Sequence, residues 1–444
     1  MELFEYTKSP IRLIMKNIQT IIREDLMEHI HHTTQLIGMK DKNITLNKAL
    51  KHETHIELMA TLDYQPPKCK HCMGIQIKYD FQKPSKIPFI EIDGLPSLIR
   101  LKKRRFQCKD CHKVTVSETN LVKKNCQISE LLRQKIAQLL INRESLTHIA
   151  SKLAISTSTV YRKLQEFHSK ENYNTLPEVL SWDEFAYQKG KLAFIAQDFQ
   201  TKKIMTILDN RCQTTIRNHF FKYSKETRNR VKVVTVDMAG SYIPIIKILF
   251  PKAKIVLDRF HIVQHMNRAL NKTRIQIMKQ FPKNSLEYRA LKYYWKLIQK
   301  DSRKLSLNAF YSRTFRETIT PRECLGKIFK LVPKLRLYYD LYQLLLFHLQ
   351  EKNTEHFFGL IKDALPVLNH TFKTALNTFI RYKNYITNAI ELPYSNAKLE
   401  ATNKLIKDIK RNAFGYRNFE NFKQRIYFAL NTTKEKTNFV SSRA

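Results

Sequence analysis

Val231–Asp237 reads VKVVTVD, a run of mostly β-branched residues that ends in a carboxylate. A run of this kind is typical of a central strand that is buried on both faces of a sheet. A helical spacing over 242–250 and a second apolar run over 254–258 follow it, which predicts a parallel β-α-β unit. This stretch decides the fold class, because it requires an α/β domain.

Three strand-like runs precede this unit, at 179–185, 191–198 and 203–208, and their short separations predict an antiparallel meander. Three antiparallel strands followed by β-α-β is the order of the ribonuclease H-like fold, in which the first strand lies beside the fourth. Asp183 in the first strand and Asp237 at the end of the fourth then become neighbours. Two carboxylates placed in this way suit divalent metal ions and phosphoryl chemistry.

Four of the seven cysteines form two C-x-x-C pairs, and two such pairs together supply the four ligands of a tetrahedral zinc site. The segment between the pairs contains two strand-like runs, 87–92 and 98–101, on either side of the turn signal Asp93-Gly94. We therefore expect a zinc ribbon with an extended hairpin. Its Zn²⁺ ligands are predicted to be Cys69, Cys72, Cys108 and Cys111.

From 128 to 167 the apolar residues recur at helical spacing and predict three short helices. Ser156 or Thr157 is suited to cap the third helix, which follows a tight turn. This is the pattern of a helix-turn-helix, whose last helix lies in the major groove of DNA. The alternative is a three-helix packing module without a DNA partner. The side chains that we expect to face DNA are Thr157, Thr159, Arg162 and Lys163.

The composition points to a polyanionic partner. Lys and Arg number 78 against 39 Asp and Glu, a formal net charge of +39, and nucleic acid fits this excess better than a membrane surface. The 26 Phe and 20 Tyr exclude a disordered basic tail protein. No apolar run is long enough to cross a membrane. We expect a cytoplasmic, DNA-associated protein with no membrane partner.

Six motifs occur together between residues 182 and 419. In this combination, and with the ribbon and helix-turn-helix before them, the chain resembles the bacterial transposases of the ISL-three insertion-sequence family from about residue 38 to about 432. The motifs are Trp182-Asp183-Glu184, Val236-Asp237-Met238, Asp258-Arg259-Phe260-His261, the run NAKLEATN at 396–403, Lys410-Arg411, and FGYRNF at 414–419.

The resemblance implies a DNA transposase whose metal ligands are Asp183, Asp237 and Glu400, holding Mg²⁺ or Mn²⁺. Asp258 and Glu184 are the main rivals for a ligand role, but the predicted topology puts the strand of Asp258 outside the first and fourth. We therefore place Asp258, Arg259 and His261 beside the metal ligands rather than among them. The helix that begins near Glu400 continues with basic residues that we expect to contact DNA, namely Lys404, Lys407, Lys410 and Arg411.

The implied partners are double-stranded DNA at the terminal inverted repeats of its own element and at the target, bound by a homodimer or a higher oligomer. Two other functions remain open: a DNA-binding regulator derived from a transposase, without catalytic activity, and a ribonuclease H-like nuclease acting on RNA or junctions. The expected domains are an N-terminal extension (1–37), the zinc ribbon (38–120), the helix-turn-helix (126–170), the first part of the core (178–264), a helical insertion (265–389), the glutamate helix of the core (390–432) and a tail (433–444).

Overall fold

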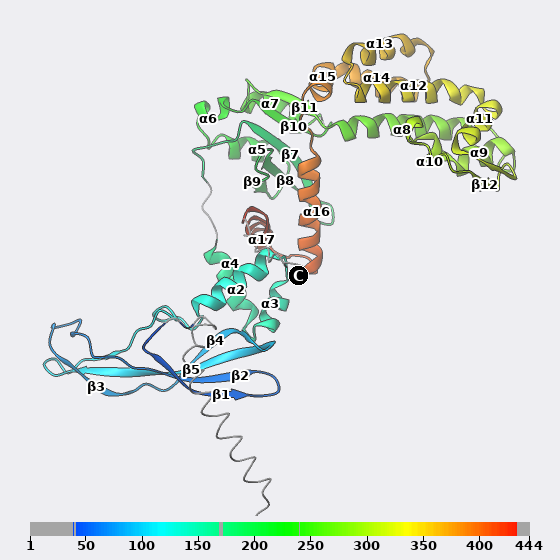
Figure 1. Cartoon of the computed structure of the whole chain (residues 1–444). Helices are drawn as coiled ribbons and strands as arrows, with labels where there is room; N and C mark the ends of the chain where they lie inside the picture. Colours follow the sequence, from blue (N-terminus) through cyan, green and yellow to red (C-terminus); the bar gives the residue numbers. More distant parts are fainter. Residues whose placement is uncertain (1–38, 40, 168–171, 239, 433–444) are drawn as a thin grey trace, which may run out of the picture. The chain divides into compact units, whose positions relative to one another are not determined.

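The computed structural model describes residues 39, 41–167, 172–238 and 240–432 (Figure 1). The chain divides into two compact units: unit 1 comprises Met1–Ser169 and Asp408–Ala444, and unit 2 comprises Lys170–Lys407. The expected extension (1–37) and tail (433–444) lie outside the described residues. Within the described ranges, no helix combines the length and the apolar character that crossing a membrane requires.

Unit 1 begins with a six-stranded sheet built around one long strand, β5. This strand pairs in parallel with β2 and antiparallel with β3, β4 and β6. The hairpin between β4 and β5 turns at Asp93 and Gly94, which both have positive φ, as a two-residue hairpin turn requires. The predicted hairpin is therefore present. The strands are β1 (Ile44–Lys51), β2 (Ile56–Leu62), β3 (Gln76–Phe81), β4 (Ser85–Ile92), β5 (Leu95–Cys108) and β6 (Val114–Val116).

The helical part of unit 1 contains the three predicted helices, α2 (Glu130–Ile141), α3 (Leu146–Lys152) and α4 (Thr157–Glu166). Each begins after a serine whose hydroxyl accepts a backbone N–H of the first turn, at 3.1 to 3.2 Å. A fourth helix, α17 (Phe419–Asn431), packs against α2 and α4. The sequence grouped α17 with the core at 390–432, whereas its buried face contacts the helix-turn-helix.

Unit 2 contains a five-stranded sheet of order β11-β10-β7-β8-β9. The first three strands in sequence form an antiparallel meander, and β10 pairs in parallel with both β7 and β11. The first strand lies beside the fourth and the fifth lies outside, which confirms the predicted strand order. The strands are β7 (Val179–Gln188), β8 (Lys191–Asp198), β9 (Ile204–Leu208), β10 (Val233–Val236) and β11 (Lys254–Leu257), with helices α5 (Gln213–Phe220), α6 (Lys225–Asn229) and α7 (Tyr242–Leu249).

A helical insertion follows β11 and begins with α8 (Arg259–Met278), which extends away from the sheet (Figure 1). Helices α12 and α14 pack along α8, and α15 returns to β11. The chain then enters α16 (Ala397–Asn412), the glutamate helix. The other elements are α9 (Leu286–Tyr293), α10 (Trp295–Ile298), η1 (Ser302–Lys304), β12 (Phe310–Ser312), β13 (Glu317–Ile319), α11 (Pro321–Leu331), α12 (Pro333–Gln350), α13 (Thr354–Ala364), η2 (Leu365–Val367), α14 (His370–Arg381) and α15 (Lys383–Glu391).

Candidate active site and metal centres

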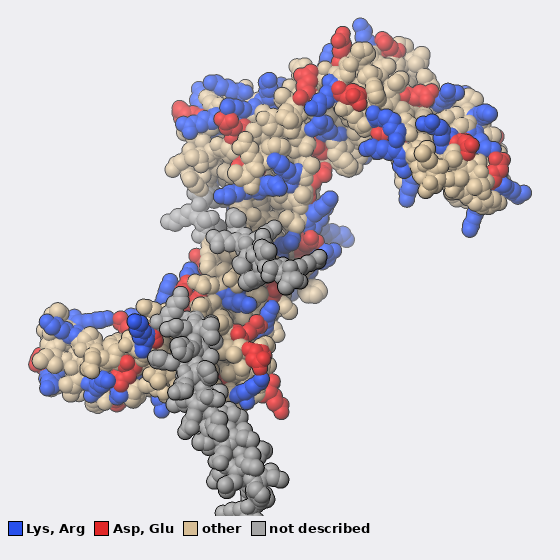
Figure 2. Space-filling model, viewed as in Figure 1, with Lys and Arg blue, Asp and Glu red and all other residues tan. Residues whose placement is uncertain are grey.

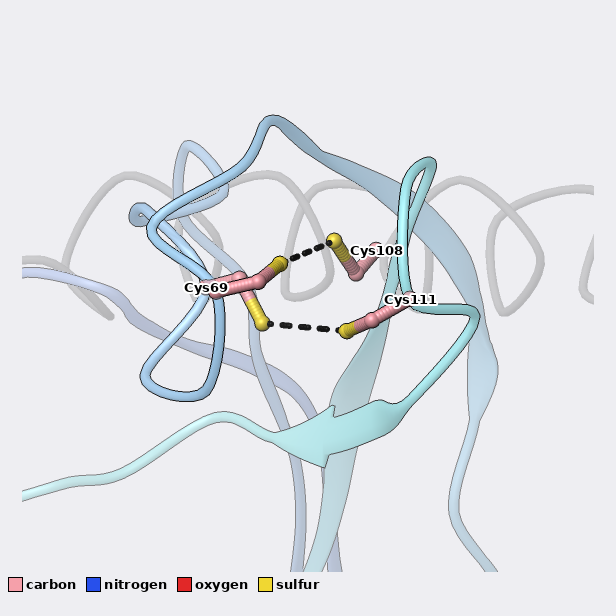
Figure 3. Close-up of side chains that lie close together, drawn as sticks. Cys69, Cys108 and Cys111 are labelled. Atoms are coloured by element: carbon pink, nitrogen blue, oxygen red, sulfur yellow. Dashed lines mark hydrogen bonds between the residues drawn. The ribbon is translucent and has the colours of Figure 1, made fainter.

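The two C-x-x-C pairs of unit 1 converge on one point, where the four sulfurs lie within 4.8 Å of one another. Figure 3 shows the two knuckles facing each other, with Cys69 Sγ 3.6 Å from Cys111 Sγ and Cys72 Sγ 3.4 Å from Cys108 Sγ. The predicted grouping of the four cysteines is therefore present. It is compatible with a zinc ion, because four thiolates are a common ligand set for structural zinc.

The two knuckles have the same backbone geometry. In each, the residue after the second cysteine has positive φ, 62° at Met73 and 54° at His112. In each, the N–H of the first cysteine bonds to a carbonyl five residues later, Gly74 or Lys113. Backbone N–H groups of His71 and Cys72 point at Cys69 and lower the pKa of its thiol to about 6. The fold therefore favours a thiolate at Cys69, the form that binds a metal. At Cys72 the Gly74 N–H is outweighed by hydrogen bonds with Cys108 and Cys111 and by burial, which raise the pKa of this thiol to about 12.

Asp183 and Asp237 come from neighbouring parallel strands of unit 2. Thr235 of β10 pairs with Ser181 of β7, and each aspartate stands two residues further along the chain, Asp183 within β7 and Asp237 directly after β10. Because parallel strands lie about 4.8 Å apart, the two aspartates are at the same level on adjacent strands. The sequence predicted this neighbourhood from the strand order alone.

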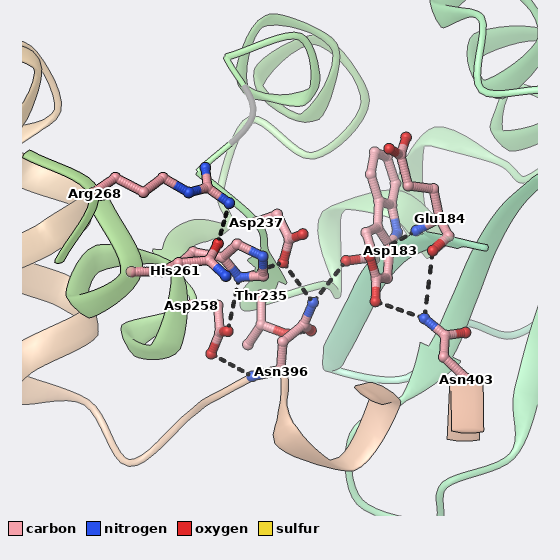
Figure 4. A network of polar contacts seen from close by, with 11 residues as sticks. Asp183, Glu184, Thr235, Asp237, Asp258, His261, Arg268, Asn396 and Asn403 are labelled. Carbon is pink, nitrogen blue, oxygen red and sulfur yellow. Dashed lines mark hydrogen bonds and ion pairs between the residues drawn. The ribbon is translucent and has the colours of Figure 1, made fainter. Parts of the chain in front are cut away.

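Asn396, just before α16, connects several parts of this site (Figure 4). Its side-chain amide donates to the carbonyl of Trp182 at 3.0 Å and to Asp237 Oδ1 at 3.5 Å, and its oxygen accepts from Thr235 at 2.9 Å. Its backbone N–H donates to Asp258 Oδ1 at 3.3 Å. Asn396 is fully buried, so these bonds fix the start of α16 against the edge of the sheet.

Asn403, in α16, contacts the other central aspartate, Asp183. Its Nδ2 donates to Asp183 Oδ2 at 2.7 Å, while the backbone N–H of Glu184 donates to Asp183 Oδ1 at 2.7 Å. Asn403 is buried, and among the described residues its Oδ1 has no hydrogen-bond partner. Asn403 directly precedes the basic residues expected to contact DNA, but its side chain turns inward to the carboxylate.

His261, in the first turn of α8, lies between two carboxylates. Its Nδ1 is 3.0 Å from Asp258 Oδ2 and 3.1 Å from Asp237 Oδ1, and the ligand atoms of all three residues lie within 4.8 Å of one another. The hydrogen bond to Asp258 raises the pKa of the His261 imidazole, and Asp237 adds to this effect. The two carboxylates therefore favour protonation of this imidazole, and its protonated form offsets part of the negative charge at the sheet edge.

The charged forms of Asp183 and Asp237 are still disfavoured beside His261. Burial, and then the charge of Asp237, raise the pKa of Asp183 to about 7. Burial also raises the pKa of Asp237 to about 6, against the lowering effect of His261. Both groups are thus held in a place where their charged forms are disfavoured, an arrangement that is characteristic of functional sites.

Glu400 lies in the first turn of α16 and is partly buried. Its charge contributes to the raised pKa of Asp237, so the carboxylate acts on the same group as Asp258 does. Among the described residues, the carboxylates and imidazole close enough to share one ion are those of Asp237, Asp258 and His261. Asp258 thus lies within ion-binding distance of Asp237, whereas its predicted strand position suggested that it lies further out.

The chain matches the transposase family DDE_Tnp_ISL3 over residues 180–426, which is 247 of its 444 residues. This range includes every carboxylate described above. The chain belongs to the ISL-three transposase family. Residues 117–168 separately match the helix-turn-helix domain of transposase family ISL3, so the family assignment extends into unit 1 and implies DNA binding.

Two curated relatives are similar to parts of this ISL-three transposase. The transposase for insertion sequence element IS1001 of Bordetella parapertussis is 25% identical over 343 residues, covering 73% of this chain and 79% of that protein. A Lactococcus lactis subsp. lactis protein named ATP-dependent protease is 38% identical over 108 residues. That match spans 24% of this chain and about a third (34%) of the relative.

The third helix of the helix-turn-helix presents part of the predicted DNA-facing set. Thr157 and Arg162 are exposed, and Lys163 is partly buried and paired with Glu166. The expectation that Thr159 is exposed is wrong, because it is buried and accepts hydrogen bonds within its own turn. Thr159 is the third residue of the capped turn, so its hydroxyl faces the cap rather than solvent.

The basic residues of α16 differ in exposure. Lys404 and Lys407 are exposed, Arg411 is exposed and paired with Asp408 at 2.8 Å, and Lys410 is partly buried. Arg259, beside His261, is partly buried at the start of α8.

Two features of the site were missed from the sequence. Asn396 and Asn403 stand seven residues apart, two helical turns, and both turn toward the carboxylates. This spacing within one motif was visible and could have indicated a shared inward face.

Proposed function

We propose that this protein is an active DNA transposase that binds the ends of its own insertion sequence and catalyses metal-dependent strand cleavage and transfer. The observation that carries the proposal is the pair Asp183 and Asp237, level on adjacent strands and both with raised pKa. We also propose that the five-stranded sheet is a ribonuclease H-like core, which the strand order supports.

The residues at the sheet edge fit Mg²⁺ or Mn²⁺. These cations prefer carboxylate and amide oxygens, and the site offers the carboxylates together with an Asn403 oxygen that has no donor in the described part of the chain. A cation would also offset the burial and the neighbouring negative charges that raise the two pKa values. When bound, the metal supplies charge stabilisation at the scissile phosphate and activates water or a 3′-hydroxyl for attack.

The protein's own residues prepare this site. Asn396 and Asn403 hold one aspartate each and fix α16 relative to the strands, so that Glu400 is presented from a rigid helix turn. His261 donates toward Asp237 and Asp258 and keeps both oriented. We propose Asp183, Asp237 and Glu400 as the metal ligands, with Asp258, Arg259 and His261 orienting them.

Recognition of the element ends is assigned to unit 1. We propose that Thr157, Arg162 and Lys163 of α4 contact the terminal inverted repeats, and that the four cysteines hold Zn²⁺ and stabilise the ribbon. Lys404, Lys407, Lys410 and Arg411 would contact phosphates of the bound strand or of the target DNA. The active form would be a homodimer or a higher oligomer on DNA.

The test is cleavage of labelled element ends by the parent protein and by Asp237→Ala. We expect the substitution to abolish cleavage, because it removes a metal ligand, and to leave end binding within a few-fold, because recognition belongs to other residues. Asp209→Ala is the matched control, since Asp209 is a carboxylate outside the site. Equal cutting by Asp237→Ala and the parent would contradict the proposal.

A DNA-binding regulator without activity is the second candidate. It predicts metal-independent binding of the element ends and no cleavage by the parent protein in either Mg²⁺ or Mn²⁺. The raised pKa values of Asp183 and Asp237 argue against it, because a regulator has no use for two neighbouring carboxylates whose charged forms are disfavoured.

A further inference from the structure

A hollow of about 300 Å³ lies on the helical insertion, apart from the carboxylate site. It is formed where α9, α10 and β12 meet, elements that lie together in Figure 1. Aromatic rings, two lysines and one leucine make up its lining, and carboxylates do not contribute to it. The lining residues are Tyr293, Tyr294, Lys296, Leu297, Lys300 and Phe310.

The lysines of this region lack acidic partners. Lys292, Lys296 and Lys300 recur every four residues, and in the described part of the chain no carboxylate oxygen lies within 4.0 Å of their ammonium groups. Lys292 lies 5.6 Å from the ring of Tyr293, and Lys296 lies 5.6 Å from the ring of Trp295. Figure 2 shows Lys and Arg side chains distributed along this insertion. Three lysines without acidic partners, two of them beside aromatic rings, favour an anionic, planar ligand.

The aromatic side chains are exposed without an evident packing reason. Tyr293 is 62% exposed and Trp295 is 38% exposed, although each carries a large apolar ring. The wall behind them is rigid, because the Tyr294 ring stacks on Phe315 at 5.9 Å and its hydroxyl bonds to Ser312 at 2.5 Å. Fixed rings at a solvent boundary form a ready surface on which another ring can stack.

Hydrogen bonds locate the hollow along α8. Arg274 of α8 donates to the carbonyl of Leu291 at 2.6 Å, and Gln299 donates to the carbonyl of Asn267 at 3.1 Å. Asn267 and Arg274 stand 9 and 16 residues after Asp258. At 1.5 Å per residue, the hollow lies roughly 13 to 24 Å along α8 from the carboxylates. A DNA strand engaged at the sheet edge can therefore reach it within a few nucleotides.

We propose that this hollow binds unpaired DNA, with a base stacked on Tyr293 and its flanking phosphates held by Lys296 and Lys300. Bases inside a duplex are stacked on each other and cannot reach a ring on a protein, so the aromatic part of the site selects single strands. The lysines supply the sequence-independent phosphate contacts that such a site requires. The site is additional to cleavage, and it rests on the proposed function only in taking DNA as the polyanion.

Tryptophan fluorescence reports on this region, because Trp295 stands between the lining residues Tyr294 and Lys296 in the sequence and the second tryptophan, Trp182, is fully buried. The experiment titrates the full-length protein, without divalent metal, with a single-stranded oligothymidylate of 12 nucleotides and with a mixed-sequence duplex of the same length. We expect the single strand to quench the emission and the duplex to leave it nearly unchanged. In Trp295→Phe the quenching should disappear, while the emission of Trp182 remains.

Two substitutions and a control decide the outcome. Tyr293→Ala should weaken single-strand binding at least about fivefold, in line with the loss of one stacked base. Lys296→Gln should weaken it and reduce its salt dependence. Phe221→Ala removes another exposed ring of unit 2, 48% exposed and stacked on Arg228, and should have no effect.

The proposal is overturned if the oligothymidylate leaves the emission unchanged or if Tyr293→Ala binds it like the parent. It is also overturned if the duplex quenches the tryptophan emission equally, because the lysines then bind phosphates without any contact between a base and Tyr293. Tyr293 is largely exposed, so circular dichroism of Tyr293→Ala should match the parent. None of these readouts needs cleavage, so they remain informative even if Asp237→Ala shows the metal triad to be misassigned.

Discussion

Arg425 in unit 1 and the two aspartates in unit 2 are charged groups that the fold buries in opposite ways. In unit 1, the buried Arg425 guanidinium has partners of complementary charge, because it donates to the carbonyls of Leu140 and Glu144 at 2.5 and 2.8 Å. In unit 2, Asp183 and Asp237 are held together although burial and mutual repulsion disfavour their charges. The same kind of chemistry thus stabilises one unit and strains the other.

This difference distinguishes polar residues that stabilise the fold from polar residues that serve catalysis. A structural site lowers the free energy of the fold and loses stability when it is altered, whereas a catalytic site is held by the surrounding fold and gains stability when its charges are removed. Unit 1 should therefore respond to substitution with a loss of stability, and the carboxylates of unit 2 with a gain.

The largest expected change in stability follows substitution of a cysteine in the four-cysteine cluster. Cys69→Ser should release one zinc ion per chain and unfold the ribbon, because structural zinc contributes about 10–16 kcal/mol in small zinc domains at pH 7. Elemental analysis and thermal unfolding measure both consequences. Cys126→Ser is the matched control, since Cys126 is exposed and outside the cluster. A parent protein that is purified without zinc would contradict the assignment.

The next effect is at the contact between α17 and the helix-turn-helix. Arg425→Met should lower the stability of unit 1 by about 2–4 kcal/mol, because the carbonyls of Leu140 and Glu144 lose their buried donor. Thermal or urea unfolding measures this loss. Arg411→Met, at a mostly exposed arginine, should stay within about 0.5 kcal/mol. Equal effects of the two substitutions would show that α17 does not depend on this contact.

The smallest effect should have the opposite sign. Asp183→Asn removes one of two opposed charges, and Asn403 can rotate its amide to present an oxygen to the new side chain. The pKa of Asp183 is raised from 3.8 to about 7 in the folded state. Ionisation of Asp183 therefore leaves the free energy of unfolding unchanged below pH 4, lowers it progressively between pH 4 and pH 7, and lowers it by the full amount above pH 7. The metal-free variant should therefore exceed the parent in stability by about 1–2 kcal/mol at pH 8, and by less at pH 5.

Thermal unfolding at the two pH values checks this sign. Addition of Mg²⁺ should raise the Tm of the parent and narrow its difference from Asp183→Asn. A variant that is less stable than the parent at pH 8 would show that the carboxylates are not opposed and would remove the contrast between the units.

Local signals in the sequence were sufficient for much of this structure. The paired cysteines, the serine caps and the Asp93-Gly94 turn each depend on a few consecutive residues, and the strand order followed from the lengths of the connections. The role of Asn396 was not predictable in this way, because its partners Trp182 and Asp237 lie more than 150 residues away in the sequence. Thr159 was misjudged because helical spacing alone does not show that its hydroxyl faces the cap.

The packing of α17 was hidden for a similar reason. Helix α17 follows the glutamate helix in sequence, so proximity grouped it with the core. Its buried arginine is complementary to carbonyls at the end of α2, which lie about 280 residues earlier. A charged residue on an otherwise apolar helix face was the available signal.

The central claim is that Asp183, Asp237 and Glu400 hold the catalytic metal ions, and cleavage of labelled element ends by Glu400→Gln and Asp258→Asn tests it most directly. Asp258 is the strict rival, because it lies closer to Asp237 and His261 in one cluster. We predict that Glu400→Gln is inactive in both Mg²⁺ and Mn²⁺. Asp258→Asn should retain cutting in Mn²⁺, reduced by about 10–100-fold, as expected for a residue that orients a ligand. An inactive Asp258→Asn together with an active Glu400→Gln would contradict the account.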